Sequence, residues 1–303
     1  MLARLQQGIV AGLLLLAVAW VVGARDQPGW VVLAGLLGLG TAHAAVLALE
    51  FGLMHAVNRH DPAPRAAWGA LLRAWIGESL AAPRVFLWQQ PFRSQAWPDR
   101  LPERQAGEPA RRGVVLVHGF VCNRGLWNRW LQQLTGQGRP FCAVNLEPVF
   151  GSVDDYVPLV EAAVLRVTRA TGLSPLVVCH SMGGLAVRAW LRAHQADARV
   201  AGVVTLGSPH QGTWLARLSF VVNGSQMRQD SRWLAQLQRD EPSARAALFT
   251  CYYSACDNIV FPASTALLPG ARHVAVSGVA HVAMVSDQAI VDAVLASLDA
   301  PCG

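Results

Sequence analysis

Strand-like and helix-like segments alternate along the chain from residue 113 onward. The apolar runs of strand length are 113–117, 141–145, 175–179, 200–206, 247–253 and 272–277, and the amphipathic stretches of helix length are 126–137, 152–171, 182–194 and 282–298. This alternation is typical of a parallel sheet, because each helical crossover covers one face of the sheet and returns the chain to the same edge. The sequence therefore predicts an α/β fold over 113–303, with a mostly parallel sheet and helices on both faces.

One interval of this region contains no strand-like run. Residues 210–245 hold apolar side chains such as Trp214, Phe220 and Trp233, separated by polar residues. An insertion of this length in a compact domain is commonly functional. We expect a helical lid at about 210–245, over the functional site. A cap that only completes the fold is compatible with the same sequence.

The first 54 residues differ in composition from the rest. The whole chain is 53% hydrophobic and 15% charged, and residues 9–24 and 30–49 contain no Asp, Glu, Lys or Arg. At ~1.5 Å per residue, about 20 helical residues cross the ~30 Å hydrocarbon core of a bilayer. We expect a membrane anchor over 1–54, with transmembrane helices 9–24 and 30–49 forming a hairpin around the Pro28-Gly29 turn. Alternatively, residues 1–24 are a cleaved signal peptide or an incompletely inserted segment.

The basic residues that flank the hairpin predict its orientation. Arg4 precedes the hairpin, and Arg59, Arg65 and Arg73 follow it. Basic residues near membrane helices stay on the cytoplasmic side. We therefore expect the chain after the hairpin to lie on the cytoplasmic side of an inner membrane, and a cleaved signal peptide would give the same side.

Residues 55–112 form an Arg-, Pro- and Trp-rich juxtamembrane linker in this interpretation. Apolar residues recur at helical spacing within it, namely Trp68, Leu71 and Leu72, Trp75 and Ile76, and Leu80. Such an amphipathic helix either lies in the membrane interface or packs on the globular domain. The formal net charge of +6 is scattered and accompanies no nucleic-acid motif, so we expect a membrane and no nucleic acid as partner. Protein partners stay open.

The run LVVCHSMGGLAV contains the candidate nucleophile. It puts Ser181 between the end of a strand and the start of a helix, where a sharp turn lifts Oγ above the edge of the sheet. Small residues must flank such a turn, because strand and helix approach each other closely. Gly183 is one of them, whereas Cys179 stands where the G-x-S-x-G pattern has glycine.

A serine nucleophile needs a base, and the base needs a carboxylate that orients it. Asp257 follows the next-to-last strand-like run in SACDNIV, and His281 follows the last in SGVAHVAM. The order Ser181, Asp257, His281 is the one expected when successive strand ends supply the three groups. Their predicted roles are nucleophile, orienting acid and general base.

Acyl transfer also needs N–H donors for the developing oxyanion. The first strand-like run ends at His118-Gly119-Phe120, beside the expected site. We expect the backbone N–H groups of Phe120 and Met182 to form the oxyanion hole. The turns that carry them would be supported by His118, Gly119, His180 and Gly183. The sequence indicates no metal and no cofactor.

The segments VLVHGF, CHSMGG, TLGSPHQGT, CDNIV and GVAH resemble the alpha/beta-hydrolase superfamily. The resemblance is to its bacterial lipase and esterase branch, including triacylglycerol lipases and GPI-inositol-deacylase-like proteins, and it covers residue 113 to the C-terminus. It implies an acyl-serine mechanism on a carboxylic ester, without a cofactor. Together with the anchor and the apolar insert, it points to lipid or long-chain acyl esters, and to a bacterial inner-membrane protein whose catalytic domain faces the cytoplasm. An acyltransferase or thioesterase with the same triad, and a catalytically silent membrane-tethered interaction module, are the alternatives.

Cys122 and Cys256 lie in predicted loops and could pair in an oxidising compartment.

Overall fold

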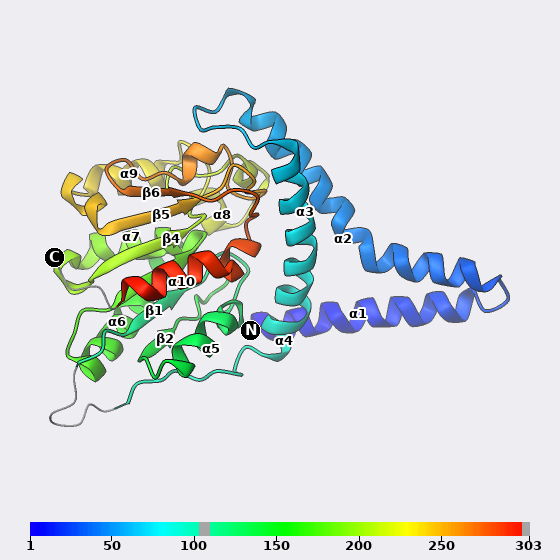
Figure 1. The fold of residues 1–303 in the computed structure, drawn as a ribbon, viewed down its shortest axis with the longest axis horizontal. Coiled ribbons are helices and arrows are strands. Elements are labelled where there is room, and N and C mark those ends of the chain that lie inside the picture. Colours follow the sequence, from blue (N-terminus) through cyan, green and yellow to red (C-terminus); the bar gives the residue numbers. More distant parts are fainter. Residues whose placement is uncertain (103–109, 299–303) are drawn as a thin grey trace.

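The computed structural model describes residues 1–102 and 110–298. Six parallel strands form one sheet in the order β2-β1-β3-β4-β5-β6. The strands are β1 (Val114–Val117), β2 (Phe141–Ala143), β3 (Leu176–His180), β4 (Gly202–Leu206), β5 (Phe249–Tyr253) and β6 (Arg272–Ala275). Each lies within two residues of its predicted bounds. The predicted parallel sheet is confirmed (Figure 1).

Both faces of the sheet are covered by helices. Along β1, Val115 and Val117 belong to the core shared with α6 (Val157–Thr171) and α7 (Met182–His194). The alternate residues, Val114 and Leu116, face the opposite core, which contains α5 (Asn128–Gly136) and α10 (Gln288–Ser297). Successive strand side chains point to opposite faces, so a strand buried on both sides must be apolar throughout.

The interval between β4 and β5 contains short helices. They are a 3₁₀ turn (Trp214–Leu218), α8 (Val222–Gln226) and α9 (Arg232–Asp240). Leu234 of α9 is buried in the core next to α7, and Trp233 Nε1 donates a hydrogen bond to Asp154 Oδ2 at 2.7 Å. By contrast, Leu218 and Phe220 are exposed, Phe220 at 95%. Thus α9 packs on the flank of the domain, whereas the stretch before it presents apolar side chains to the outside.

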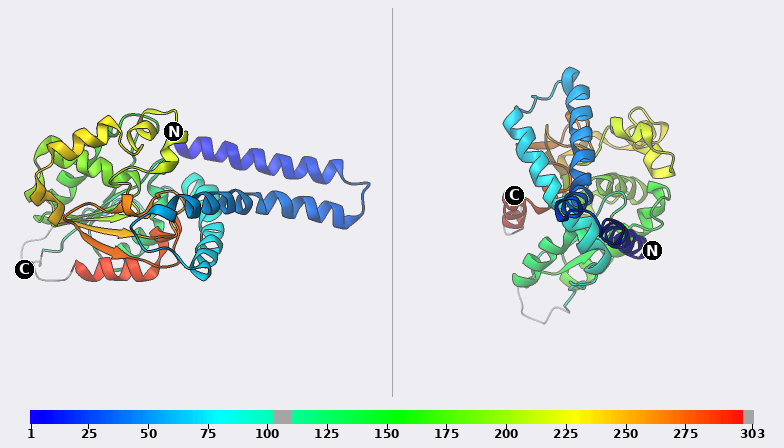
Figure 2. Two further views of the ribbon diagram at one scale, coloured as in Figure 1. Left: turned by 90° about the horizontal axis from the view of Figure 1, so that it is seen from above. Right: turned by 90° about the vertical axis from the view of Figure 1, so that its right-hand side faces the viewer.

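Two long helices extend away from the sheet as an antiparallel hairpin (Figures 1 and 2). They are α1 (Leu2–Gly23) and α2 (Gly29–Val57), and each is long and apolar enough to cross a membrane. Trp20 Nε1 donates to Val32 O at 3.1 Å, and a β-carbon at Gly35 would lie only 2.0 Å from Trp20 Cε2. The helices therefore approach closely because residue 35 has no side chain. Helix α1 begins before its predicted span 9–24 and ends at Gly23, and α2 extends beyond its predicted span 30–49 at both ends.

Helix α3 (Trp68–Pro83) lies across the edge of the sheet at which the strands end (Figure 1). It is followed by a π-helical segment (Arg84–Gln89) and α4 (Gln90–Phe92). One face of α3 is buried against α2 and the sheet domain; the opposite face exposes Trp68, Leu72, Ile76 and Leu80. The predicted helix therefore packs on the globular domain with one face and keeps a second apolar face open.

Candidate active site

Ser181 occupies the sharp turn between β3 and α7. Its backbone has φ +54° and ψ −129°, a conformation that an L-residue adopts only under strain. A β-carbon at Gly183 would lie 2.3 Å from Val117 O, so only glycine lets α7 begin this close to β1. Cys179 is fully buried in the core and does not reach the turn surface. This strand–turn–helix geometry is the one the sequence predicts.

The turn that follows β1 packs directly on Ser181. A β-carbon at Gly119 would lie 2.7 Å from Ser181 Cβ, so the chain runs past the serine at van der Waals contact. This brings the backbone of Phe120 next to Ser181. Met182 is the first residue of α7, where backbone N–H groups have no acceptor within the helix. The two residues expected to supply oxyanion donors therefore flank Ser181.

His118 and His180 connect the turns around the serine. The His118 Nδ1–H group donates to Gly119 O at 2.9 Å, and Leu146 N–H donates to His118 Nε2 at 3.0 Å. His180 Nε2 lies 3.2 Å from His281 O, and the rings of these two histidines are 4.5 Å apart. Burial lowers the pKa of His118 to about 4 and also lowers the pKa of His180. Both imidazoles are therefore neutral supports.

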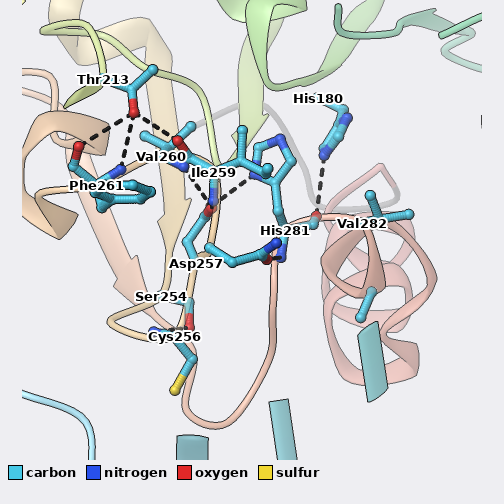
Figure 3. A network of polar contacts seen from close by, with 12 residues as sticks. His180, Thr213, Ser254, Cys256, Asp257, Ile259, Val260, Phe261, His281 and Val282 are labelled. Carbon is cyan, nitrogen blue, oxygen red and sulfur yellow. Dashed lines mark hydrogen bonds and ion pairs between the residues drawn. The ribbon is translucent and has the colours of Figure 1, made fainter. Parts of the chain in front are cut away.

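Asp257 and His281 form a buried hydrogen-bonded pair (Figure 3). His281 Nδ1 lies 2.9 Å from Asp257 Oδ2, and Asp257 Oδ1 accepts the N–H groups of Ile259 and Val260 at 2.9 and 2.7 Å. These donors hold the carboxylate in one orientation and assign the Nδ1 proton to the hydrogen bond with Asp257. Burial alone would lower the pKa of His281, but the Asp257 carboxylate raises it above the ordinary histidine value.

The end of β4 connects Ser181 to this pair. Ser181 N–H donates to Leu206 O at 2.9 Å. The next residue, Gly207, has φ +57°, and a β-carbon there would lie 2.8 Å from Asp257 Oδ2. Within residues 1–102 and 110–298, no hydrogen bond joins Ser181 directly to His281. Catalytic hydrogen bonds are often long in proteins without substrate and shorten when substrate binds.

Glu78 also belongs to this region, although it is not among the site residues that the sequence predicts. Glu78 lies on the buried face of α3, four residues after Ala74, and is 1% exposed. Its Oε1 accepts the N–H of Val282 and its Oε2 the N–H of Ala283, both at 2.9 Å. The sequence feature that could have identified Glu78 is a carboxylate on the apolar face of a predicted amphipathic helix.

Glu50 near the end of α2 is a second residue of this kind. It accepts a hydrogen bond from Asn258 Nδ2 at 2.8 Å, and Asn258 Oδ1 accepts the N–H of His281 at 3.4 Å. An acidic residue at the end of an otherwise uncharged apolar stretch was the signal here. Both residues come from the region before 113 that the sequence assigns to an anchor and a linker.

The cysteines and the possible metal ligands of the described residues were also compared with the expectations from the sequence. Among the residues that the structure describes, no group of three or more His, Cys, Asp or Glu side chains could hold a metal ion. Cys122 and Cys256 are both buried and unpaired with each other. Burial raises the pKa of the Cys122 thiol to about 12.

Comparison with solved structures finds proteins that resemble about two thirds of this chain. No family model and no curated protein matches it. The mature form of a Bacillus licheniformis lipase, BlEst2, matches with a TM-score of 0.56 and 19% identity, over 65% of this chain and 95% of that one. Its propeptide form matches with a TM-score of 0.56 and 19% identity, over 66% of this chain and 52% of that one. A lipase B of Aspergillus fumigatus has a TM-score of 0.49 and 19% identity, over 57% and 47% of the two chains.

These likenesses identify the architecture of the sheet domain. The two forms of the Bacillus licheniformis lipase have an overall fold similar to that of the sheet domain, with TM-scores of 0.56. The chain has the alpha/beta-hydrolase fold, as the sequence motifs predict, preceded by two long apolar helices that run as a hairpin.

Proposed function

We propose that this protein is a membrane-anchored serine hydrolase that cleaves carboxylic esters through an acyl-serine intermediate. The observation that carries the proposal is the Asp257–His281 pair beside the strained Ser181 turn, at the edge where the strands of the sheet end. In an open parallel α/β sheet, ligands bind outside this edge. One fold can host many chemistries, so the proposed activity depends on these side chains and not on the fold alone.

In the acylation step, Ser181 Oγ attacks the ester carbonyl carbon and gives its proton to His281 Nε2. Asp257 stays ionised, keeps the Nδ1 proton of His281 in place and stabilises the imidazolium that forms. The backbone N–H groups of Phe120 and Met182 stabilise the negative charge on the carbonyl oxygen. His281 then donates its proton to the leaving alcohol as the carbon–oxygen bond breaks.

Deacylation uses the same groups with water as nucleophile. His281 Nε2 accepts a proton from water while the water oxygen attacks the acyl carbon. Collapse of the second tetrahedral intermediate returns that proton to Ser181 Oγ and releases the carboxylic acid. The Asp257 carboxylate raises the pKa of His281, and this supports the role because it strengthens the imidazole as a proton acceptor.

The α1–α2 hairpin supports attachment to a membrane. Its side chains are apolar and largely exposed over the length of a bilayer crossing, which is costly in water and favourable in lipid. A backbone in lipid must satisfy its own hydrogen bonds, and two continuous helices do so. The basic residues on both flanks support a cytoplasmic catalytic domain.

Lipid or long-chain acyl esters are the proposed substrates. The edge of the sheet that carries Ser181 faces the base of the hairpin (Figure 2). Phe150, Leu218 and Phe220 are exposed, and the ring of Phe150 lies 5.9 Å from that of Phe120, which follows the turn beside Ser181. Asn223 Nδ2 donates to Val149 O at 2.9 Å, which brings the segment after Phe220 beside Phe150. Exposed apolar groups next to an anchor favour substrates that reside in the bilayer.

A fluorophosphonate probe tests the nucleophile. The probe should label the detergent-solubilised wild-type protein and fail to label Ser181→Ala. Asp257→Asn should lower ester turnover by about 10³–10⁴-fold, because an amide favours the wrong tautomer of the base. Labelling that persists in Ser181→Ala, or that disappears in Cys179→Ala, would exclude the proposed nucleophile.

A further inference from the structure

The loop that carries His281 is held from outside the alpha/beta-hydrolase domain. Both carboxylate oxygens of Glu78 on α3 are used, one on Val282 N–H and one on Ala283 N–H. These two residues directly follow His281, so the hydrogen bonds fix the backbone on which the imidazole stands. Glu78 is 204 residues before Val282 in the chain.

Packing around these hydrogen bonds is incomplete. A groove of about 540 Å³ lies between α3 and the loop, lined by residues that include Gly77, Ala81 and Ala283. The side chains of Val282 and Met284 are buried in the core and hold the loop by apolar packing, whereas its backbone N–H groups at 282 and 283 are held by the Glu78 carboxylate. The paired hydrogen bonds are charge-assisted, which makes them stronger than neutral ones.

The acid of the pair is tied to the same helical region. Glu50 on α2 holds Asn258, which directly follows Asp257, and Asn258 Oδ1 also accepts the N–H of His281. Two carboxylates from two helices before residue 113 therefore act on the two loops that supply the candidate acid and base.

From this arrangement we propose that Glu78 is a positioning residue for His281, and that α3 is a working part of the catalytic site. This inference depends on the proposed esterase function. A displacement of about 1 Å in a catalytic group can cost about 10²-fold in rate, so a loop released from Glu78 would slow the chemical step. Substrate binding would change little, because Glu78 is buried behind the loop.

The positioning role requires an ionised Glu78. A protonated carboxyl would turn one acceptor oxygen into a donor that opposes an N–H group. Burial raises the pKa of Glu78 to about 7, against the effect of its two backbone hydrogen bonds and of the facing His281; Asp257 also faces it and raises the value. Glu50 faces His281 from α2, and Arg73 of α3 lies beside Gly278 of the same loop. Both Glu78 and His281 must therefore lose a proton for full activity.

Kinetics of Glu78→Gln with a soluble short-chain ester test the proposal. The amide can accept only one of the two N–H groups, so we expect kcat to fall about 10- to 100-fold with KM within about 2-fold of wild type. The acid limb of log kcat/KM against pH should approach a slope of two in the wild type and of one in Glu78→Gln. Asp292→Asn, an exposed carboxyl-to-amide change on α10, should match the wild type in both respects.

Glu78→Asp keeps the test decisive if the glutamine variant does not fold. It retains the charge but shortens the side chain, so kcat should fall while the slope of two persists. Wild-type kcat and an unchanged acid limb in Glu78→Gln would overturn the proposal. A wild-type protein that neither reacts with a fluorophosphonate nor cleaves esters would instead refute the proposed function itself.

Discussion

Gly207 lies directly against the Asp257 carboxylate: a β-carbon at this glycine would be 2.8 Å from Asp257 Oδ2 and 3.2 Å from His281 Nδ1. The end of β4 is thus shaped around the acid–base pair. The positive φ of Gly207, +57°, is a second reason for glycine at this position, because a left-handed backbone conformation costs an L-residue about 1–2 kcal/mol.

Gly207→Ala should therefore lower kcat by at least about 10-fold and reduce the free energy of unfolding by about 1–2 kcal/mol. Gly138→Ala is the matched control, because Gly138 has a similar φ of +66° and its β-carbon would contact only the Arg111 side chain at 3.9 Å. The control should lose similar stability and keep wild-type kcat. Equal kcat in the two variants would show that residue 207 needs glycine only for its backbone conformation and not for its contact with Asp257 and His281.

Stability should depend on pH through Glu78. Its pKa is raised from 4.5 to about 7, so the folded protein binds this proton more tightly than the unfolded chain does. The contribution is complete below about pH 4.5 and is lost as the pH rises through about 7, by up to about 3 kcal/mol. The free energy of unfolding of the wild type, minus that of Glu78→Gln, should fall across this window.

Thermal unfolding of both proteins in the same detergent from pH 5 to 8 measures this difference. His281 titrates in both and largely cancels. A difference that stays constant with pH would contradict the raised pKa. Activity and stability are expected to change in opposite directions here, because the ionised carboxylate that holds the loop is the less stable form of the folded protein.

Topology reporters test the membrane orientation. A reporter that works only in the cytoplasm should be active when it is fused after residue 303. The same reporter should be inactive when it is inserted between Gln27 and Pro28, because this turn is expected on the opposite side of the membrane. The expectation follows from the basic residues on both flanks of the hairpin. An external C-terminus would contradict it and would place Cys122 and Cys256 in a more oxidising compartment.

Phe220 should matter for substrates that reside in lipid. It is 95% exposed, so Phe220→Asp removes no internal packing and should leave thermal stability and short-chain turnover unchanged. Turnover of long-chain esters in vesicles should fall several-fold, because one large apolar side chain contributes about 1.5–3 kcal/mol when it enters an apolar environment. Equal effects on short and long esters would assign Phe220 no role at the lipid surface.

Hydrophobic patterns in the sequence predict the strands of the sheet correctly, but they do not predict how the segments between the strands pack. Each strand-like run is long enough to cross the sheet, and burial on both faces demands apolar side chains, so runs such as 175–179 identify strands directly. The positions of Ser181, Asp257 and His281 follow, since parallel strands end at one edge. The packing of the insert 210–245 could not be predicted in this way. Trp233 and Phe220 are both large apolar residues in the same kind of sequence context, yet Trp233 packs on the flank of the domain and Phe220 is exposed.

The sequence by itself determined the parallel sheet, the two long apolar helices and the strand ends that carry the candidate site residues, because hydrophobic periodicity and chain order are local properties. Only the tertiary structure decided that Glu78 caps the backbone after His281 and that Gly207 borders Asp257. A backbone N–H group can donate a hydrogen bond to any nearby oxygen, whether it belongs to water, to its own segment or to a distant side chain. Which one it meets depends on how helices far apart in the sequence pack, and no local pattern encodes that choice.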